Sequence, residues 1–223
     1  GESELYFPRS LLFEQGVVAL RAVGVEFETS HNGFFTSLAV HNGEAGEVED
    51  HRTWVTAKWG WQDRNKLRLG FSGQTGSTEP TATSSSTATV KLGNADFAQD
   101  ALWRIGSLFV HWHPSDFQMF LEFHKGEVVQ SEVLQGRFVG AHLDLIWQFT
   151  ERWKVMGRWD QFDLNSKVAG DVQKLATLGV SFSNNTHTSE VFLYASKNIE
   201  EVDLPNDELR LQWRLTPLLP SSL

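Results

Sequence analysis

Apolar side chains recur at every second position through most of this chain, and polar side chains fill the positions between them. The segment LDLIWQF, residues 143–149, places four apolar side chains on one face and Asp144 and Gln148 on the other. A period of two residues is that of a β-strand, and no run of about 18 apolar residues predicts a membrane-spanning helix. The pattern therefore predicts an all-β protein.

Eleven segments carry this alternation: 24–30, 34–41, 53–61, 66–72, 105–112, 117–124, 139–149, 153–163, 175–183, 190–196 and 209–215. Tight turns such as HNG, QDRN, PSD and TER alternate along the chain with longer polar connectors, including residues 73–100 and 125–136. Short periplasmic turns and long extracellular loops are typical of antiparallel barrels that span an outer membrane. The chain is therefore predicted to be a single transmembrane β-barrel domain, 1–223, with about 11 or 12 strands.

The alternating pattern does not settle the role of the chain ends or the exact number of strands. Residues 1–21 are expected to be a lead-in segment or a partial strand, and residues 216–223 a C-terminal extension. Because an antiparallel barrel closes with an even number of strands, an eleventh strand implies a twelfth. It could be residues 5–13, despite Pro8, or it could come from another chain.

Charges collect on one face of each strand, and this indicates which face meets lipid. If the Trp- and Leu-rich faces pointed inward, large side chains and a plug would have to fill the barrel, and no helical pattern supplies a plug. Charges facing hydrocarbon would cost about 2 to 4 kcal/mol each at the midplane. The side chains predicted to face the lumen are Arg21, Lys58, Arg68, Glu122, Asp144, Lys154, Arg158, Asp160, Arg210 and Arg214.

Aromatic residues are abundant, with nine Trp and 16 Phe against two Tyr. Tryptophans near strand ends on the apolar face are expected to anchor the barrel at the membrane interfaces, with sugar stacking as the minor alternative. The predicted interface tryptophans are Trp59, Trp61, Trp112, Trp147, Trp153, Trp159 and Trp213.

Composition and motifs narrow the chemistry. A net charge of −9 with scattered basic residues gives no reason to expect a nucleic-acid partner, and cysteine is absent. His142 and Asp144 share a strand face, but no serine context suited to a hydrolase accompanies them. His111 and His124 could contribute to a metal site, yet no third ligand follows at a fixed spacing. Neither an enzyme nor a cofactor or metal is predicted.

Three stretches carry a resemblance to a known family: RAVGVEFETSHNGFFTSLAVHNGEAG (21–46), VMGRWDQFD (155–163) and ELRLQWRL (208–215). They resemble, in the same order, strands of the phosphate-selective porins O and P and their relatives. The resemblance implies a trimeric channel of sixteen strands, of which this chain would form the later part. It departs from the family at TPLLPSSL (216–223), where a terminal aromatic residue is usual. Only Arg21 lies in a motif that matches the family's.

These observations lead to one main hypothesis for the function and two alternatives. The first hypothesis is a passive outer-membrane channel for small hydrophilic or anionic solutes, with membrane lipid, lipopolysaccharide and copies of itself or another outer-membrane chain as partners. The alternatives are a structural barrel, plugged or embedded in a larger envelope complex, and a soluble ligand-binding barrel. The arginines could select anions or form salt bridges with lumen acids. A charge at Leu145 is expected to impair insertion, and an uncharged residue at Arg158 to alter conductance at most.

Overall fold

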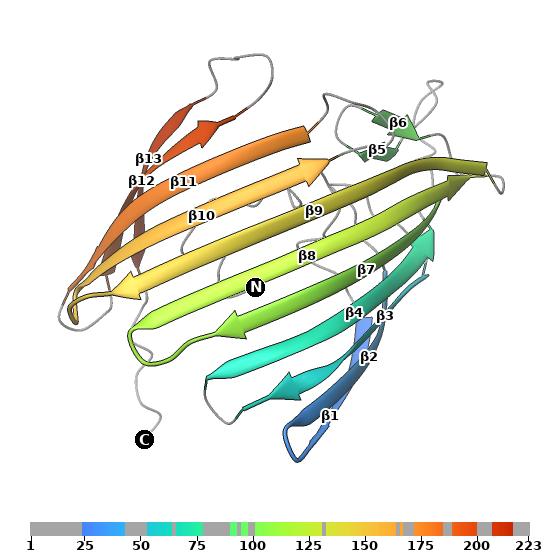
Figure 1. The fold of residues 1–223 in the computed structure, drawn as a ribbon, viewed down its shortest axis with the longest axis horizontal. Coiled ribbons are helices and arrows are strands. Elements are labelled where there is room, and N and C mark those ends of the chain that lie inside the picture. The colour runs from blue at the N-terminus through green and yellow to red at the C-terminus, as the bar shows by residue number, and fades with distance from the viewer. Residues whose placement is uncertain are drawn as a thin grey trace.

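The structure is a computed structural model that describes residues 24–42, 53–63, 66–77, 90–92, 95–97, 101–130, 133–163, 166, 172–184, 189–199 and 207–215. These residues form one antiparallel sheet of eleven strands and a separate two-stranded hairpin. Neighbours in the sheet follow one another along the sequence, with only the separate β5–β6 hairpin inserted between β4 and β7, so the sheet is a meander (Figure 1). Its strands are β1 (Gly24–His31), β2 (Phe34–Asn42), β3 (Thr53–Gln62), β4 (Leu67–Ser77), β7 (Ala101–Trp112), β8 (Phe117–Gln130), β9 (Val133–Gln148), β10 (Trp153–Asp163), β11 (Val172–Ser183), β12 (Ser189–Asn198) and β13 (Glu208–Leu215).

All eleven predicted strands are confirmed, but two predicted loops are partly wrong. Within residues 73–100, β4 continues to Ser77, and β5 (Val90–Leu92) pairs with β6 (Ala95–Phe97). Within residues 125–136, β8 and β9 extend until only residues 131 and 132 separate them. A register shift at Val128 and Val129 interrupts the strict alternation there, which hides a strand from a pattern with period two. The long paired strands β8 and β9 cross most of the width of Figure 1.

The tight turns predicted from the sequence all lie at one end of the strands, and local chemistry explains two of them. Between β1 and β2, Asn32 and Gly33 both have positive φ angles, 50° and 84°, as a two-residue hairpin turn of type I′ requires. Between β9 and β10, the hydroxyl of Thr150 accepts a hydrogen bond from the backbone N–H of Trp153 at 3.0 Å. These contacts hold neighbouring strands in the register that the side-chain pattern requires.

The two faces of the sheet differ in burial and chemistry. One face, the exposed face, carries large apolar side chains that project outward, such as Trp59, Phe71, Leu145 and Trp147. The other, the buried face, mixes buried aromatic side chains with buried polar and charged ones. Direct cross-strand partners lie on the same face, so each face is continuous from β1 to β13.

The buried face contains an apolar cluster of Phe120, Ile146, Met156, Phe192 and Tyr194. These five side chains come from β8, β9, β10 and β12, so the cluster ties together distant parts of the meander. The sequence pattern predicts a lumen face made mainly of polar and charged side chains, with few side chains as large as these. The buried face is therefore more apolar than expected.

The sheet has two edges. Among the described strands, β1 pairs only with β2 and β13 only with β12, and the sheet is not closed. Apolar side chains at both edges, including Phe27 and Leu211, are highly exposed. Closure of the sheet into a barrel requires strands beyond those described, and the predicted strand at residues 5–13 lies outside the described residues.

No helix long and apolar enough to cross a bilayer occurs in the described part of the chain.

Candidate functional site: charged clusters on the buried face

Nine of the ten side chains predicted to face a lumen lie on the buried face, and Arg21 lies outside the described residues. Cross-strand register shows why they come together. Arg68, His111, Phe120, Asp144 and Arg158 follow one another as direct partners across β4, β7, β8, β9 and β10. Side chains that are far apart in sequence therefore form one row across the sheet.

The most buried charged group is the pair Arg158 and Asp144. The guanidinium donates from Nε to Oδ1 at 2.5 Å and from a terminal nitrogen to Oδ2 at 2.7 Å, and both side chains are at most 1% exposed. Asp160, two residues along β10, lies 3.9 Å from the guanidinium. Two parallel hydrogen bonds between a planar guanidinium and a carboxylate are geometrically specific, so this pair fastens β9 to β10.

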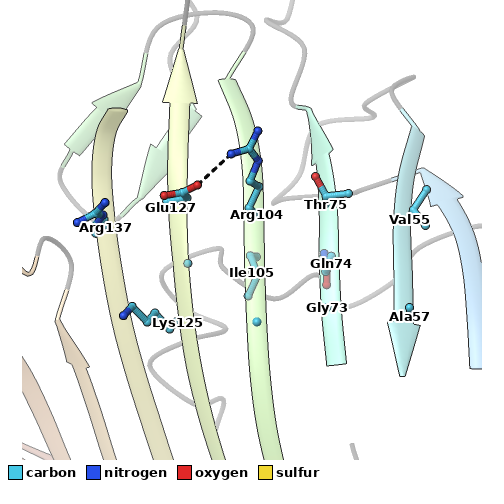
Figure 2. A pocket seen from close by; sticks show the side chains of 12 residues that line it. Val55, Ala57, Gly73, Gln74, Thr75, Arg104, Ile105, Lys125, Glu127 and Arg137 are labelled. Atoms are coloured by element: carbon cyan, nitrogen blue, oxygen red, sulfur yellow. Dashed lines mark hydrogen bonds and ion pairs between the residues drawn. The ribbon is translucent and has the colours of Figure 1, made fainter. Parts of the chain in front are cut away.

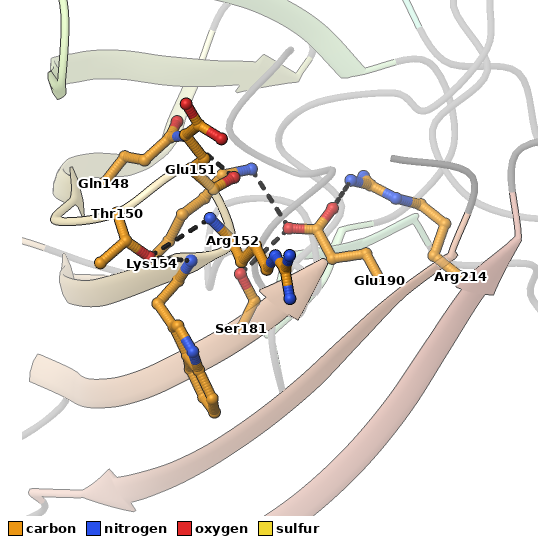
Figure 3. A network of polar contacts seen from close by, with 9 residues as sticks. Gln148, Thr150, Glu151, Arg152, Lys154, Ser181, Glu190 and Arg214 are labelled. Atoms are coloured by element: carbon orange, nitrogen blue, oxygen red, sulfur yellow. Dashed lines mark hydrogen bonds and ion pairs between the residues drawn. The ribbon is translucent and has the colours of Figure 1, made fainter. Parts of the chain in front are cut away.

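A second cluster centres on Glu190 and joins four strands (Figure 3). Lys154 on β10 donates to its carboxylate at 3.1 Å, and the Ser181 hydroxyl on β11 donates at 3.0 Å. Arg214 on β13 forms an ion pair with the second carboxylate oxygen. One acid thus compensates two cations, and the group carries a net positive charge.

A third cluster surrounds Glu122 on β8. His111 Nε2 lies 3.0 Å from Oε1 and His124 Nε2 lies 3.3 Å from Oε2. His142, the direct cross-strand partner of Glu122, stacks its ring on that of His124 with centroids 6.3 Å apart. Three imidazoles thus surround one carboxylate.

The cations of the remaining strands have looser contacts. Lys58 lies 3.5 Å from Glu26, with both side chains about half exposed. Arg68 lies over the ring of Phe35, 4.3 Å from its centroid, and its buried Nε has no hydrogen-bond partner among the described residues. Arg210 pairs with Glu208 at 2.6 Å on the edge strand β13. Most of the predicted lumen cations are therefore in ion pairs.

All nine tryptophans lie in described strands and divide between the two faces. Trp54 and Trp103 are buried, and they form a line of ring contacts with Phe138 and Phe162 across the buried face. The seven tryptophans predicted as interface anchors lie on the exposed face, as register shows for each: Trp59, Trp61, Trp112, Trp147, Trp153, Trp159 and Trp213.

The exposed face has a hollow of about 530 Å³ at the loop end of β3, β4, β7, β8 and β9 (Figure 2). Its base is formed by small outward positions that are direct partners in a row, Ala57, Gly73 and Gly106. A Cβ added to Gly73 would meet no atom within 4 Å, so the space is open.

Charged side chains border this hollow. Arg104, Glu127 and Arg137 are direct partners across β7, β8 and β9, and Arg104 lies 3.2 Å from Glu127. Lys125 lies beside them, two residues along β8. The border therefore holds three cations and one anion, a feature that the sequence analysis missed because all four residues lay outside the predicted strands 105–112, 117–124 and 139–149.

The sequence also offered little sign of Glu190 and Ser181, or of the contact between Glu122 and His142. Period two places each of these side chains on the correct face, but contact between strands depends on register. Glu122 and His142 are twenty residues apart, and they become neighbours only because the extended β8–β9 hairpin aligns them. The only signal in the sequence for these contacts was that polar residues occupy the same face of neighbouring strands.

An antiparallel meander whose outer surface is largely apolar, with charges there gathered at the loop end, and whose other charges lie on the buried face defines a porin-like β-barrel of the bacterial outer membrane, which is supported by comparison with known proteins. The chain belongs to the beta-barrel porin-2, OmpL-like family, whose model matches residues 2–199. No significant match is found among curated proteins.

Solved structures with a similar fold come from Vibrio cholerae. OmpT folded in vitro, in a trimer form, aligns with a TM-score of 0.61 at 12% identity, over 96% of this chain and 66% of that one. OmpT with loop L8 deleted aligns with a TM-score of 0.55 at 10% identity, over 78% of this chain and 56% of that one. This chain thus spans between about half and two thirds of the barrels that it matches, and the likeness is one of fold.

Proposed function

We propose that the protein is a passive channel for small hydrophilic or anionic solutes, without catalytic activity, and that residues 1–223 belong to one barrel domain. The observation that carries this proposal is the separation of chemistry between the faces. The exposed face offers apolar side chains to lipid on every strand, whereas Asp144, Arg158, Glu190 and their partners lie on the buried face. Charges of both signs along a lumen can be satisfied by water and by one another.

The test is ion conductance of the full-length protein, purified in detergent and added to a planar lipid bilayer. Discrete, long-lived conductance steps are expected. Insertion without conductance would overturn the proposal, and protease protection of the strands in liposomes would show that the silent protein had inserted.

A modest preference for anions, as in the phosphate-selective porins, is part of this proposal. Arg68 supports it because its buried Nε lacks a hydrogen-bond partner among the described residues, and a passing anion could accept from it. Most other cations are neutralised by acids, which argues for weak selectivity. The reversal potential in a potassium chloride gradient measures the preference, and Arg68→Gln is expected to reduce it.

A structural barrel without transport is the second candidate. The fully buried Phe138, Met156 and Phe162 favour it, since bulky apolar side chains on the lumen face narrow a pore. A silent barrel that co-purifies stoichiometrically with another outer-membrane chain would establish this role. Channel steps from the isolated protein would exclude it.

The partners that we propose are phosphorylated outer-membrane glycolipids and further copies of the chain. Long barrel loops are extracellular, so the hollow beside Lys125 would lie in the outer leaflet, where lipopolysaccharide phosphates could bind Arg104, Lys125 and Arg137. Binding of lipid A to the protein in detergent should weaken when these three residues are changed to Gln, and when Gly106→Leu fills the hollow. Lys197→Gln is the control, and lipid A without phosphates should bind poorly to every variant.

A homotrimer is proposed because the OmpT structure that covers most of this chain is a trimer form. Light scattering of the detergent-solubilised protein, corrected for bound detergent, gives the protein mass directly. A mass of one chain would contradict the trimer without bearing on conductance.

A further inference from the structure

A group of metal-ligand side chains lies in the wall formed by β8 and β9. Glu122 and His124 are two residues apart on β8, and His142 faces Glu122 directly across the hairpin. One ligand atom from each of the three lies within 4.8 Å of the other two. The position opposite His124 is Gly140, which has no side chain to occupy the space beside the imidazole.

Each of the two histidines has a buried ring nitrogen without a hydrogen-bond partner among the described residues, and that of His124 lies 3.3 Å from Oε2 of Glu122. These nitrogens are Nε2 of His124 and Nδ1 of His142, and the two residues are 8% and 7% exposed. Buried polar atoms nearly always have a partner, so two such nitrogens beside one carboxylate require an explanation. A bound cation would accept their lone pairs and provide it.

Two further side chains orient the ligands as the neighbours of metal ligands usually do. The Ser107 hydroxyl lies 2.7 Å from Nδ1 of His124, so that nitrogen can donate a hydrogen bond while Nε2 remains free for an ion. His111 lies 3.0 Å from Oε1 of Glu122 and holds the carboxylate with its other oxygen toward His124. Ser107 and His111 are therefore positioning residues.

We propose that Glu122, His124 and His142 bind a divalent transition-metal ion, best fitted by Zn²⁺, in the wall of the barrel. Tetrahedral zinc with bonds of about 2.0 to 2.1 Å separates its ligands by about 3.3 Å. His124 Nε2 and Glu122 Oε2 already lie 3.3 Å apart, and a ligand atom of His142 lies within 4.8 Å of the other two residues' ligand atoms. Two imidazoles and one carboxylate leave a fourth position for water or a solute. The site joins β8 to β9, and the proposal does not depend on whether the barrel conducts ions.

Metal binding to the full-length protein in detergent tests the proposal directly. Zn²⁺ is measured by competition with a chromogenic chelator, and Co²⁺ by its visible absorption, which is intense only for four- or five-coordinate ions. One equivalent of each metal and an intense Co²⁺ spectrum are expected. If the wild-type protein binds no stoichiometric metal, or gives the pale Co²⁺ spectrum of an octahedral ion, the proposed site is overturned. No variant is needed for this test.

Variants then assign the ligands. Ser107→Ala should weaken Zn²⁺ binding by about 10- to 100-fold, because it removes only an orienting contact. Glu122→Gln and His142→Asn each remove a ligand and should weaken it further. His113→Asn, at an exposed turn histidine, is the matched control and should leave affinity unchanged. Equal loss in the control and the ligand variants would refute the assignment.

Discussion

Arg158 on β10 and Asp144 on β9 are direct cross-strand partners that form a bidentate ion pair in a region from which solvent is almost absent. This contact corrects the expectation that an uncharged residue at Arg158 would alter conductance at most. A buried charge that loses its partner is destabilising, because its desolvation is no longer compensated. The pair therefore holds β9 and β10 together in the wall of the barrel, in addition to contributing two opposite charges to the buried face.

Replacing Arg158 should destabilise the protein. Arg158→Gln leaves the Asp144 carboxylate buried without its two charged donors, and we expect a loss of about 3 to 5 kcal/mol in unfolding free energy. Reversible urea unfolding in detergent micelles, followed by tryptophan fluorescence, measures it. The double variant with Asp144→Asn should recover part of the loss, and a single variant as stable as wild type would contradict the buried pair.

A charge on the exposed face should impair insertion. Leu145 projects from β9 three residues before the strand ends at Gln148, between its direct partners Met119 and Gly157. Leu145→Arg places a cation against hydrocarbon and should cost up to about 2 to 4 kcal/mol, which is the cost at the midplane of the bilayer. Folding yield into liposomes, read from the mobility shift of unheated samples in gels, reports the effect. Glu151→Arg, in the exposed turn after β9, is the control and should fold with normal yield.

Gly33 should be required by its backbone conformation. Its φ angle is 84°, and an added Cβ would lie 2.9 Å from both the carbonyl oxygen of Gln62 and Nε1 of Trp61. Gly33→Ala should therefore lower the unfolding free energy by at least about 1 to 2 kcal/mol. Gly73→Ala is the matched control, since its Cβ would enter open space. Equal stability of the two variants would show that the β1–β2 turn tolerates a side chain.

Glu190 should set the charge balance of its cluster. Glu190→Gln leaves Lys154 and Arg214 without their shared carboxylate and makes the group more positive by one charge. If the buried face lines a channel, the reversal potential in a potassium chloride gradient should shift toward the equilibrium potential of chloride. Glu151→Gln in the turn should leave it unchanged. A shift toward potassium would contradict the predicted orientation of this face.

The charged side chains show the limit of prediction from the sequence. Alternation placed Asp144, Lys154 and Arg158 together on the face opposite Leu145. It left open whether the arginines bind solutes or acids, because that depends on which residues are partners across strands. Register answers this for Arg158 and Arg214, whose carboxylate partners lie 14 and 24 residues away. The structure favours salt bridges for both.

The sequence by itself determined the all-β class, the eleven strands of the sheet and the face on which each side chain lies, since period two is a local property of the backbone. Only the tertiary structure decided where β8 and β9 end, which charges pair and that His142 joins Glu122 and His124. These features depend on register, which turns and a bulge set over the whole meander. A shift of one residue would exchange the two faces, and a shift of two would separate every pair.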